Sequence, residues 1–71
     1  MTKDPTRAAA PGKWCIWVDG DGKPRRVAEQ FDTADAANEA CDGLSSTLPS
    51  RATLTTYDDK GEPEYQKGPM F

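Results

Sequence analysis

Few residues in this chain can carry out catalytic chemistry. There is no His among the 71 residues, and His is the residue most often used for general acid–base catalysis. Cys15 and Cys41 therefore lack the His partner that would make a nucleophilic pair. Ser45, Ser46 and Ser50 have no base beside them, and the glycine patterns of phosphate-binding and dinucleotide-binding loops do not occur. We expect no enzyme activity, no catalytic residues and no cofactor.

The segment that begins at Asp19 partly matches a calcium-binding loop. Asp19 and Asp21 occupy its first and third positions. The fifth, sixth and twelfth positions should be an acidic or amide residue, Gly and Glu, but they are occupied by Lys23, Pro24 and Gln30. Because Asp-Gly pairs favour tight turns between strands, we predict a hairpin turn here and no metal site.

The strongest candidate for binding is a row of acidic side chains. Between residues 29 and 50 there are five acidic residues and no basic one. Asp35, Glu39 and Asp42 recur at helical spacing, and Asp32 lies just before them. Like charges four residues apart on a helix cost about a few tenths of a kcal/mol. The row is either a solvated face that maintains solubility or a docking surface for a basic protein partner.

Two aromatic residues, Trp17 and Tyr57, are further partner-binding candidates. If Ile16 and Val18 face the helix, alternation along the strands places both aromatic residues beside Arg26 on the opposite sheet face. Exposed aromatic and Arg side chains are typical of protein interfaces, and they also stack on nucleic-acid bases. The net charge of −3 argues against direct nucleic-acid binding. In the alternative, Trp17 packs beneath the N-terminal arm or the C-terminal tail.

These side chains must be positioned by a small α+β domain. Alternating and amphipathic patterns predict strands over 13–18, 25–31, 51–57 and 64–67, and a helix that begins at Asp32-Thr33 and ends near Gly43-Leu44 or one turn later. The fourth strand depends on only four residues that follow a Pro. The resulting ββαββ order predicts one helix on one face of a three- to four-stranded antiparallel sheet, with strand order 2-1-3-4.

The domain organisation is simple. Residues 13–67 form the domain, residues 1–12 a flexible N-terminal arm, and residues 68–71 a short tail. One helix covers one face of the sheet, so the other face is open unless another segment covers it. If Cys15 and Trp17 instead face the helix, Cys15 can approach Cys41.

The sequence also indicates a cellular compartment. No apolar signal segment begins the chain, and no apolar run is long enough to span a bilayer. We expect a cytoplasmic protein with reduced cysteines and no membrane partner.

One pattern is shared with known proteins. It comprises Trp14–Val18, Val27, Phe31-Asp32-Thr33, Ala36, Ala37, Ala40, Asp58, Gly61 and Tyr65. It resembles a family of small bacterial and phage ββαββ proteins of unknown function, over residues 14–65. The resemblance implies the fold and no catalytic residues. The acidic helix departs from the family, in which more Lys and Arg are expected.

In size, acidity and lack of catalytic residues the chain also resembles small phage-encoded anti-CRISPR proteins. That resemblance implies an inhibitor in the host cytoplasm that blocks a basic nucleic-acid-binding surface of a bacterial protein, such as a CRISPR–Cas component. Two alternatives remain: a nucleic-acid-binding sheet that uses Trp17, Tyr57 and Arg26, and a small assembly protein that forms homodimers.

Overall fold

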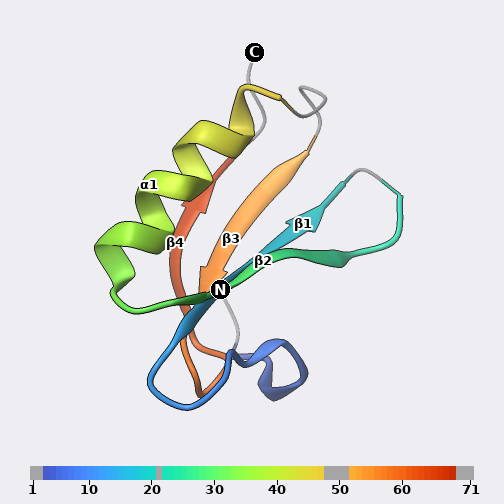
Figure 1. The fold of residues 1–71 in the computed structure, drawn as a ribbon. Coiled ribbons are helices and arrows are strands. Elements are labelled where there is room, and N and C mark those ends of the chain that lie inside the picture. Colours follow the sequence, from blue (N-terminus) through green and yellow to red (C-terminus); the bar gives the residue numbers. More distant parts are fainter. Residues whose placement is uncertain (1–2, 21, 48–51, 69–71) are drawn as a thin grey trace.

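In the part of the chain that the structure describes, four antiparallel strands form a single sheet, and one α-helix crosses one of its faces (Figure 1). The computed structural model describes residues 3–20, 22–47 and 52–68. Its elements are a short 3₁₀ helix η1 (Pro5–Arg7), β1 (Trp14–Asp19), β2 (Arg25–Phe31), α1 (Ala34–Ser45), β3 (Thr53–Tyr57) and β4 (Pro63–Lys67). The strand order β2-β1-β3-β4 and the ββαββ sequence of elements confirm the predicted α+β fold, including the fourth strand.

The β1–β2 hairpin follows from its glycines. Gly20 and Gly22 have φ values of 83° and 87°. Glycine adopts such positive φ values without steric cost, and both glycines belong to the Asp-Gly pairs that predict a turn here. The pairing of β2 with β1 is irregular at two places, and Gln30 adopts a φ of 71° near one of them. Bulges of this kind twist an edge strand and discourage pairing with another chain.

Helix α1 begins as predicted and ends at Ser45, one residue beyond the predicted Gly43-Leu44 boundary. The hydroxyl of Thr33 accepts a hydrogen bond from the Ala36 amide at 3.1 Å. Gly43 does not terminate the helix in a left-handed conformation. Instead, the hydroxyls of Ser45 and Ser46 donate to the carbonyls of Asp42 and Gly43, each at 2.8 Å, so the last turn is stabilised by side chains.

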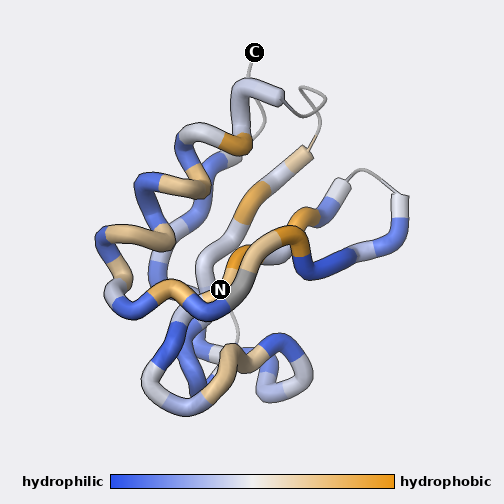
Figure 2. Tube along the Cα trace, viewed as in Figure 1, coloured by the Kyte–Doolittle hydropathy of each residue, from blue (hydrophilic) through white to orange (hydrophobic). Residues whose placement is uncertain are grey.

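The main hydrophobic core lies between α1 and the sheet. Ile16, Val18 and Leu54 are almost completely buried there, together with Cys41 and Ala52. Figure 2 shows the hydrophobic positions gathered on the central strands and on the helix side that faces them. The predicted orientation of β1 is thus confirmed, because Ile16 and Val18 face the helix.

The opposite sheet face is covered as well. The sequence predicts a flexible arm over residues 1–12, whereas residues 3–12 lie against this face in the structure, where Ala9, Cys15 and Tyr57 form a second buried cluster with Trp17 packed against it. We refer to residues 3–12 as the arm. Residues 69–71, the predicted tail beyond Gly68, lie outside the described part of the chain.

The two cysteines occupy different clusters on opposite faces of the sheet. Cys15 belongs to the arm side and Cys41 to the helix side, and no disulfide joins the two. The alternative in which Cys15 faces the helix and approaches Cys41 is therefore wrong. Burial raises the pKa of the Cys41 thiol, which keeps it neutral and unreactive.

Candidate partner-binding surfaces

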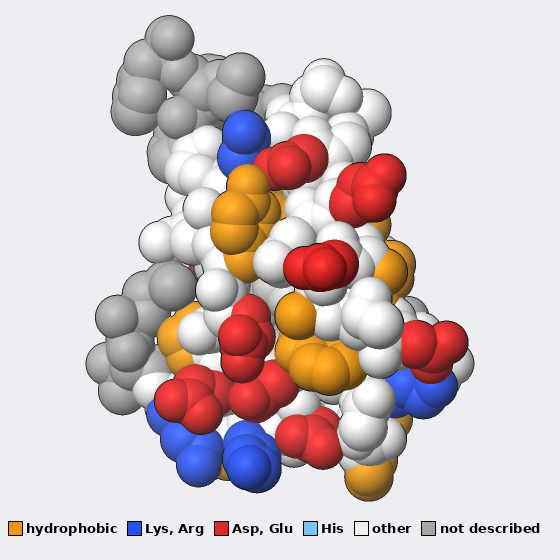
Figure 3. Space-filling view, turned by 90° about the vertical axis from the view of Figure 1, so that its left-hand side faces the viewer, with side chains coloured by type: hydrophobic (Ala, Val, Ile, Leu, Met, Phe, Trp, Pro, Cys, Tyr) orange, Lys and Arg blue, Asp and Glu red, His pale blue; other side chains and the backbone are white. Residues whose placement is uncertain are grey.

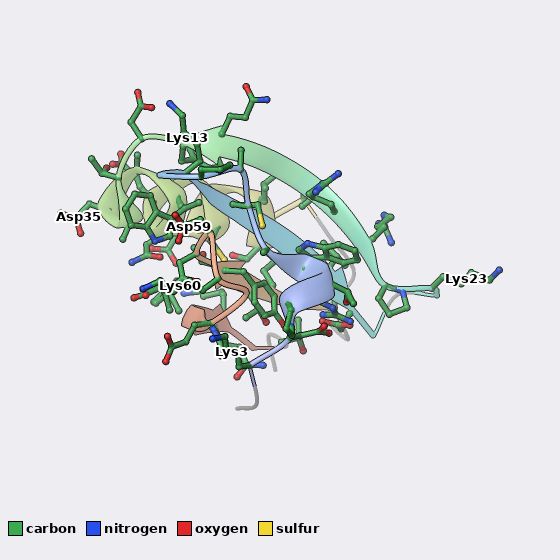
Figure 4. The ribbon with its side chains drawn as sticks, turned by 90° about the horizontal axis from the view of Figure 1, so that it is seen from below. Lys3, Lys13, Lys23, Asp35, Asp59 and Lys60 are labelled. Atoms are coloured by element: carbon green, nitrogen blue, oxygen red, sulfur yellow. The ribbon has the colours of Figure 1, made fainter. Side chains whose placement is uncertain are left out.

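The outer side of α1 carries the predicted acidic residues. Asp35 and Glu39 lie four residues apart and are exposed. Among residues 3–20, 22–47 and 52–68, neither forms an ion pair. Figure 3 shows acidic side chains spread over this side of the molecule, and Figure 4 shows Asp35 pointing away from the sheet. Asp35 and Glu39 are therefore available for contact with a basic partner.

Asp32 is in a different environment. Its carboxylate accepts a hydrogen bond from the ammonium of Lys13, which precedes β1. This hydrogen bond, followed by the charge of Lys13, holds the pKa of Asp32 below its ordinary value of 3.8. The carboxylate is 80% exposed, but its charge is already balanced within the chain.

Asp42 connects the helix to the edge strand β4. The hydroxyl of Tyr65 donates to its Oδ1 at 2.7 Å, and the ammonium of Lys67 lies 3.7 Å from the same oxygen. The hydrogen bond to Asp42 raises the pKa of Tyr65 above its ordinary value of 10.0. Asp42 thus orients β4 against α1 and, like Asp32, has a positive neighbour within the chain.

The basic residue Lys23 lies at the opposite end of the molecule from Asp35 (Figure 4). Lys23 is exposed and projects from the far end of the β1–β2 hairpin, whereas Asp35 projects from the helix at the opposite side of the view (Figure 4).

The second surface contains Trp17 and Tyr57, and its centre is Arg7. The guanidinium of Arg7 forms two hydrogen bonds with the Asp19 carboxylate, at 2.8 and 3.0 Å. It also donates to the Tyr57 hydroxyl at 3.2 Å. Its Cζ lies 4.8 Å from the centre of a Trp17 ring and 5.7 Å from that of Tyr57. We call Trp17, Asp19 and Tyr57 the guanidinium site.

This arrangement suits a guanidinium group in several respects. Two parallel hydrogen bonds match the planar fork of arginine, and the electron-rich ring faces attract its charge. The hydrogen bond from Arg7 to Asp19 is the main reason that the pKa of Arg7 is raised above its usual range. Arg7 therefore remains charged in this site, although its side chain is only 16% exposed.

Backbone hydrogen bonds hold the arm along the β3–β4 turn. The Asp4 amide donates to the Gly61 carbonyl, and the Ala9 amide donates to the Asp58 carbonyl, each at 2.9 Å. Gly61 has a φ of 80°, and a Cβ placed on it would lie 2.1 Å from the carbonyl oxygen of Asp4. Only glycine at position 61 allows the arm to approach this closely.

The guanidinium site changes the interpretation of the predicted aromatic anchors. Tyr57 is buried, with 7% of its surface exposed, and Trp17 is half-buried beneath Arg7. With the arm in place, Arg7 lies over both rings, where a base or a partner side chain would otherwise stack. The structure brings Trp17 and Tyr57 together, as predicted, but separates them from the acidic face by the thickness of the sheet.

Sequence reasoning missed the importance of Arg7. The sequence places Arg7 in the predicted flexible arm, because no apolar residue larger than Pro accompanies it in residues 3–12. A local signal was present in Asp4-Pro5-Thr6: the Asp4 carboxylate caps the Thr6 amide at 3.1 Å, and Pro5 is tolerated in the first helical turn. This signal predicts the short helix η1 but not its position on the sheet.

In residues 3–20, 22–47 and 52–68 there is no group of three or more metal-ligating side chains. No helix in the described part of the chain is both long and apolar enough to cross a membrane.

Comparisons with models of protein families, with curated proteins and with solved structures give no match. Any proposal about function therefore depends on the two surfaces described above and on the charges that they present.

Proposed function

We propose that this protein is a non-enzymatic binding module that docks on a basic surface of another protein through the outer side of α1. The observation that carries the proposal is the exposure of Asp35 and Glu39, which have no ion-pair partner within the described ranges. Repulsion between them opposes helix formation slightly. A basic partner would relieve this repulsion and gain two charge pairs.

The chemistry of the partner follows from the charge. Proteins that bind nucleic acids carry basic surfaces that contact phosphates, and a row of carboxylates can compete for such a surface. The helical rise places Asp35 and Glu39, the two acidic residues of α1 without an ion-pair partner in the described ranges, about 6 Å apart along the axis. The resemblance in type to anti-CRISPR proteins supports a bacterial nuclease or DNA-binding protein as the partner, with a Cas protein as one case.

The two alternative functions have less support. A nucleic-acid-binding sheet would require free faces on Trp17 and Tyr57, but Arg7 lies over both rings. Assembly into dimers through an open sheet face would require that face to be uncovered, but the arm lies on it.

The proposal is tested with immobilised full-length protein and bacterial extract. The test variant is Asp35→Asn with Glu39→Gln, which removes two charges without changing side-chain shape. The matched control is Glu62→Gln with Glu64→Gln, which removes two charges from exposed positions at β4 and the turn before it.

We expect the wild type and the control to retain a protein that the test variant loses. Added double-stranded DNA should displace that protein, and an increase in salt from about 50 to 300 mM should weaken its binding strongly. Equal retention by the test variant, or retention that neither DNA nor salt reduces, would contradict the proposal.

A further inference from the structure

The guanidinium site is complete without the arm. Trp17 and Asp19 belong to β1, and Tyr57 belongs to β3, so the two central strands of the sheet hold all three side chains. These strands are fixed by the core on the helix side, in which Ile16, Val18 and Leu54 are almost completely buried. Removal of Arg7 would therefore leave a formed site with a carboxylate and two aromatic rings.

The arm that fills this site is held mainly by polar contacts. Ala9 is its one buried residue, and no side chain of the arm is apolar and larger than Pro. Its other contacts include those of the Arg7 side chain, the two backbone hydrogen bonds at Asp4 and Ala9, a hydrogen bond from the Cys15 thiol to the Arg7 carbonyl at 3.2 Å, and one from the Gly12 amide to the Asp59 carboxylate at 2.8 Å. Segments that bury few apolar contacts open locally at lower free energy than the core strands do.

One polar atom beneath the arm is not satisfied by it. The indole Nε1 of Trp17 is enclosed, and it has no hydrogen-bond partner among the described residues. Buried donors are almost always paired in proteins. A different occupant that brings an acceptor to this point would bind with a hydrogen bond that the arm does not form.

We propose that the guanidinium site binds an arginine side chain of a partner protein, and that the arm is an intramolecular occupant which the partner displaces. Asp19 selects a cation and excludes the phosphates of a nucleic acid. The two hydrogen bonds from Arg7 and the two rings select the planar guanidinium over the ammonium of lysine. The site lies on the sheet face opposite α1, so this inference does not depend on the acidic docking surface.

The arm also competes with any partner for the guanidinium site, and this competition determines how tightly a partner must bind. A tethered segment has an effective concentration on the order of millimolar, so an isolated arginine in solution competes poorly with it. A partner must therefore present its arginine on a segment that makes further contacts, as the arm does at Gly61 and Asp58. The arm therefore prevents binding of arginine side chains whose neighbouring residues make no further contact with the protein.

The proposal is tested with the full-length Arg7→Ala variant, which vacates the site. The probe is a ten-residue peptide with the sequence of residues 3–12, and the comparison probe is the same peptide with lysine in place of its arginine. Binding is followed by tryptophan fluorescence, and a variant that also carries Trp17→Phe identifies the signal of Trp17.

We expect the arginine peptide to bind the Arg7→Ala variant at least tenfold more tightly than the lysine peptide does. Wild type should require at least tenfold more arginine peptide, because its own arm competes. Adding Asp19→Asn to the Arg7→Ala variant should abolish binding. Equal affinity for the two peptides, equal affinity of wild type and variant, or no binding would overturn the proposal.

Circular dichroism provides the second measurement. The Arg7→Ala variant should retain the spectrum of the wild type, because the arm is an occupant of the site. Loss of the fold would also overturn the proposal, since the arm would then be an essential part of the domain and could not be displaced.

Discussion

The two faces of the sheet are covered by different means. On one face, α1 seals a core of aliphatic side chains in which Ile16, Val18 and Leu54 are almost completely buried. On the other, the arm covers the sheet with a guanidinium that is paired with Asp19 and lies over Trp17 and Tyr57. The packing of α1 on the sheet depends on the hydrophobic effect, whereas the packing of the arm depends on an ion pair and on contacts between a cation and aromatic rings.

This difference implies that salt and pH affect the attachment of the arm more than they affect the packing of α1. Burial of apolar area is insensitive to salt and pH in the ordinary range, whereas partly exposed ion pairs are screened and titratable. The helix side should therefore determine whether the chain folds, and the arm side should determine which surface the folded chain presents.

The largest effect is expected at the helix side. Leu54→Ala removes one of the largest fully buried side chains and should cost about 2–5 kcal/mol. A domain of this size is stable by only about 3–5 kcal/mol, so much of the variant should be unfolded. Urea unfolding followed by circular dichroism measures the loss. Thr53→Ala, a partly buried position on the same strand, should change stability by less than about 1 kcal/mol. Similar losses in the two variants would contradict the assignment of the core.

The next largest effect is expected at Gly61, where the arm lies against the β3–β4 turn. Gly61→Ala introduces a Cβ that overlaps the Asp4 carbonyl, whereas Gly22→Ala introduces one into open space, although both glycines have positive φ. Backbone strain of about 1–2 kcal/mol is expected in both variants.

Only Gly61→Ala should also detach the arm, which would be seen as increased solvent quenching of Trp17 fluorescence. Equal quenching in Gly61→Ala and Gly22→Ala would show that the close approach of Asp4 does not hold the arm.

A smaller effect is expected from acid. Hydrogen bonds from Thr6 hold the pKa of Asp4 below its ordinary value of 3.8, so the ionised carboxylate is favoured when η1 is formed. The stabilisation is present above pH 3.8 and is lost as the pH falls through the lowered pKa. Trp17 fluorescence should therefore show the arm loosening below pH 3.8 before circular dichroism shows loss of the sheet. In Asp4→Asn this early step should disappear, and its persistence would assign it to another group.

The smallest change in stability is expected at the acidic face. Glu39→Gln removes one member of the repulsive pair but keeps Asp35, whose charge is favourable in the first turn of α1, so it should stabilise the chain by about a few tenths of a kcal/mol. Thermal unfolding at low salt measures this gain, which should shrink at high salt. A loss of stability would mean that the Glu39 carboxylate supports the helix.

The helix side was largely predictable from the sequence because its signals are local. Alternation predicted that Ile16 and Val18 point toward the helix, Asp-Gly pairs predicted the hairpin, and Thr33 predicted the start of α1. The spacing of Asp35 and Glu39 predicted their common exposed face. The pairing of Asp32 with Lys13 and of Asp42 with Lys67 was not predictable, because the partners in each pair are far apart in the sequence.

The arm side could not be predicted because its contacts are long-range. Arg7 meets Asp19 and Tyr57 across 12 and 50 residues of chain. A short segment of Ala, Pro and Thr contains no periodic apolar pattern that indicates docking. The role of Gly61 depends on how closely another backbone approaches it, and composition does not encode that distance.

Amide hydrogen exchange in wild type and the Arg7→Ala variant tests most directly the claim that the faces are covered independently. The reporters are the Ala9 amide, which donates to the Asp58 carbonyl, and the amides of the central strands β1 and β3. The account predicts that Ala9 loses at least tenfold of its protection in the variant while the central strands keep theirs. Equal loss at both sites, or unchanged protection of Ala9, would contradict it.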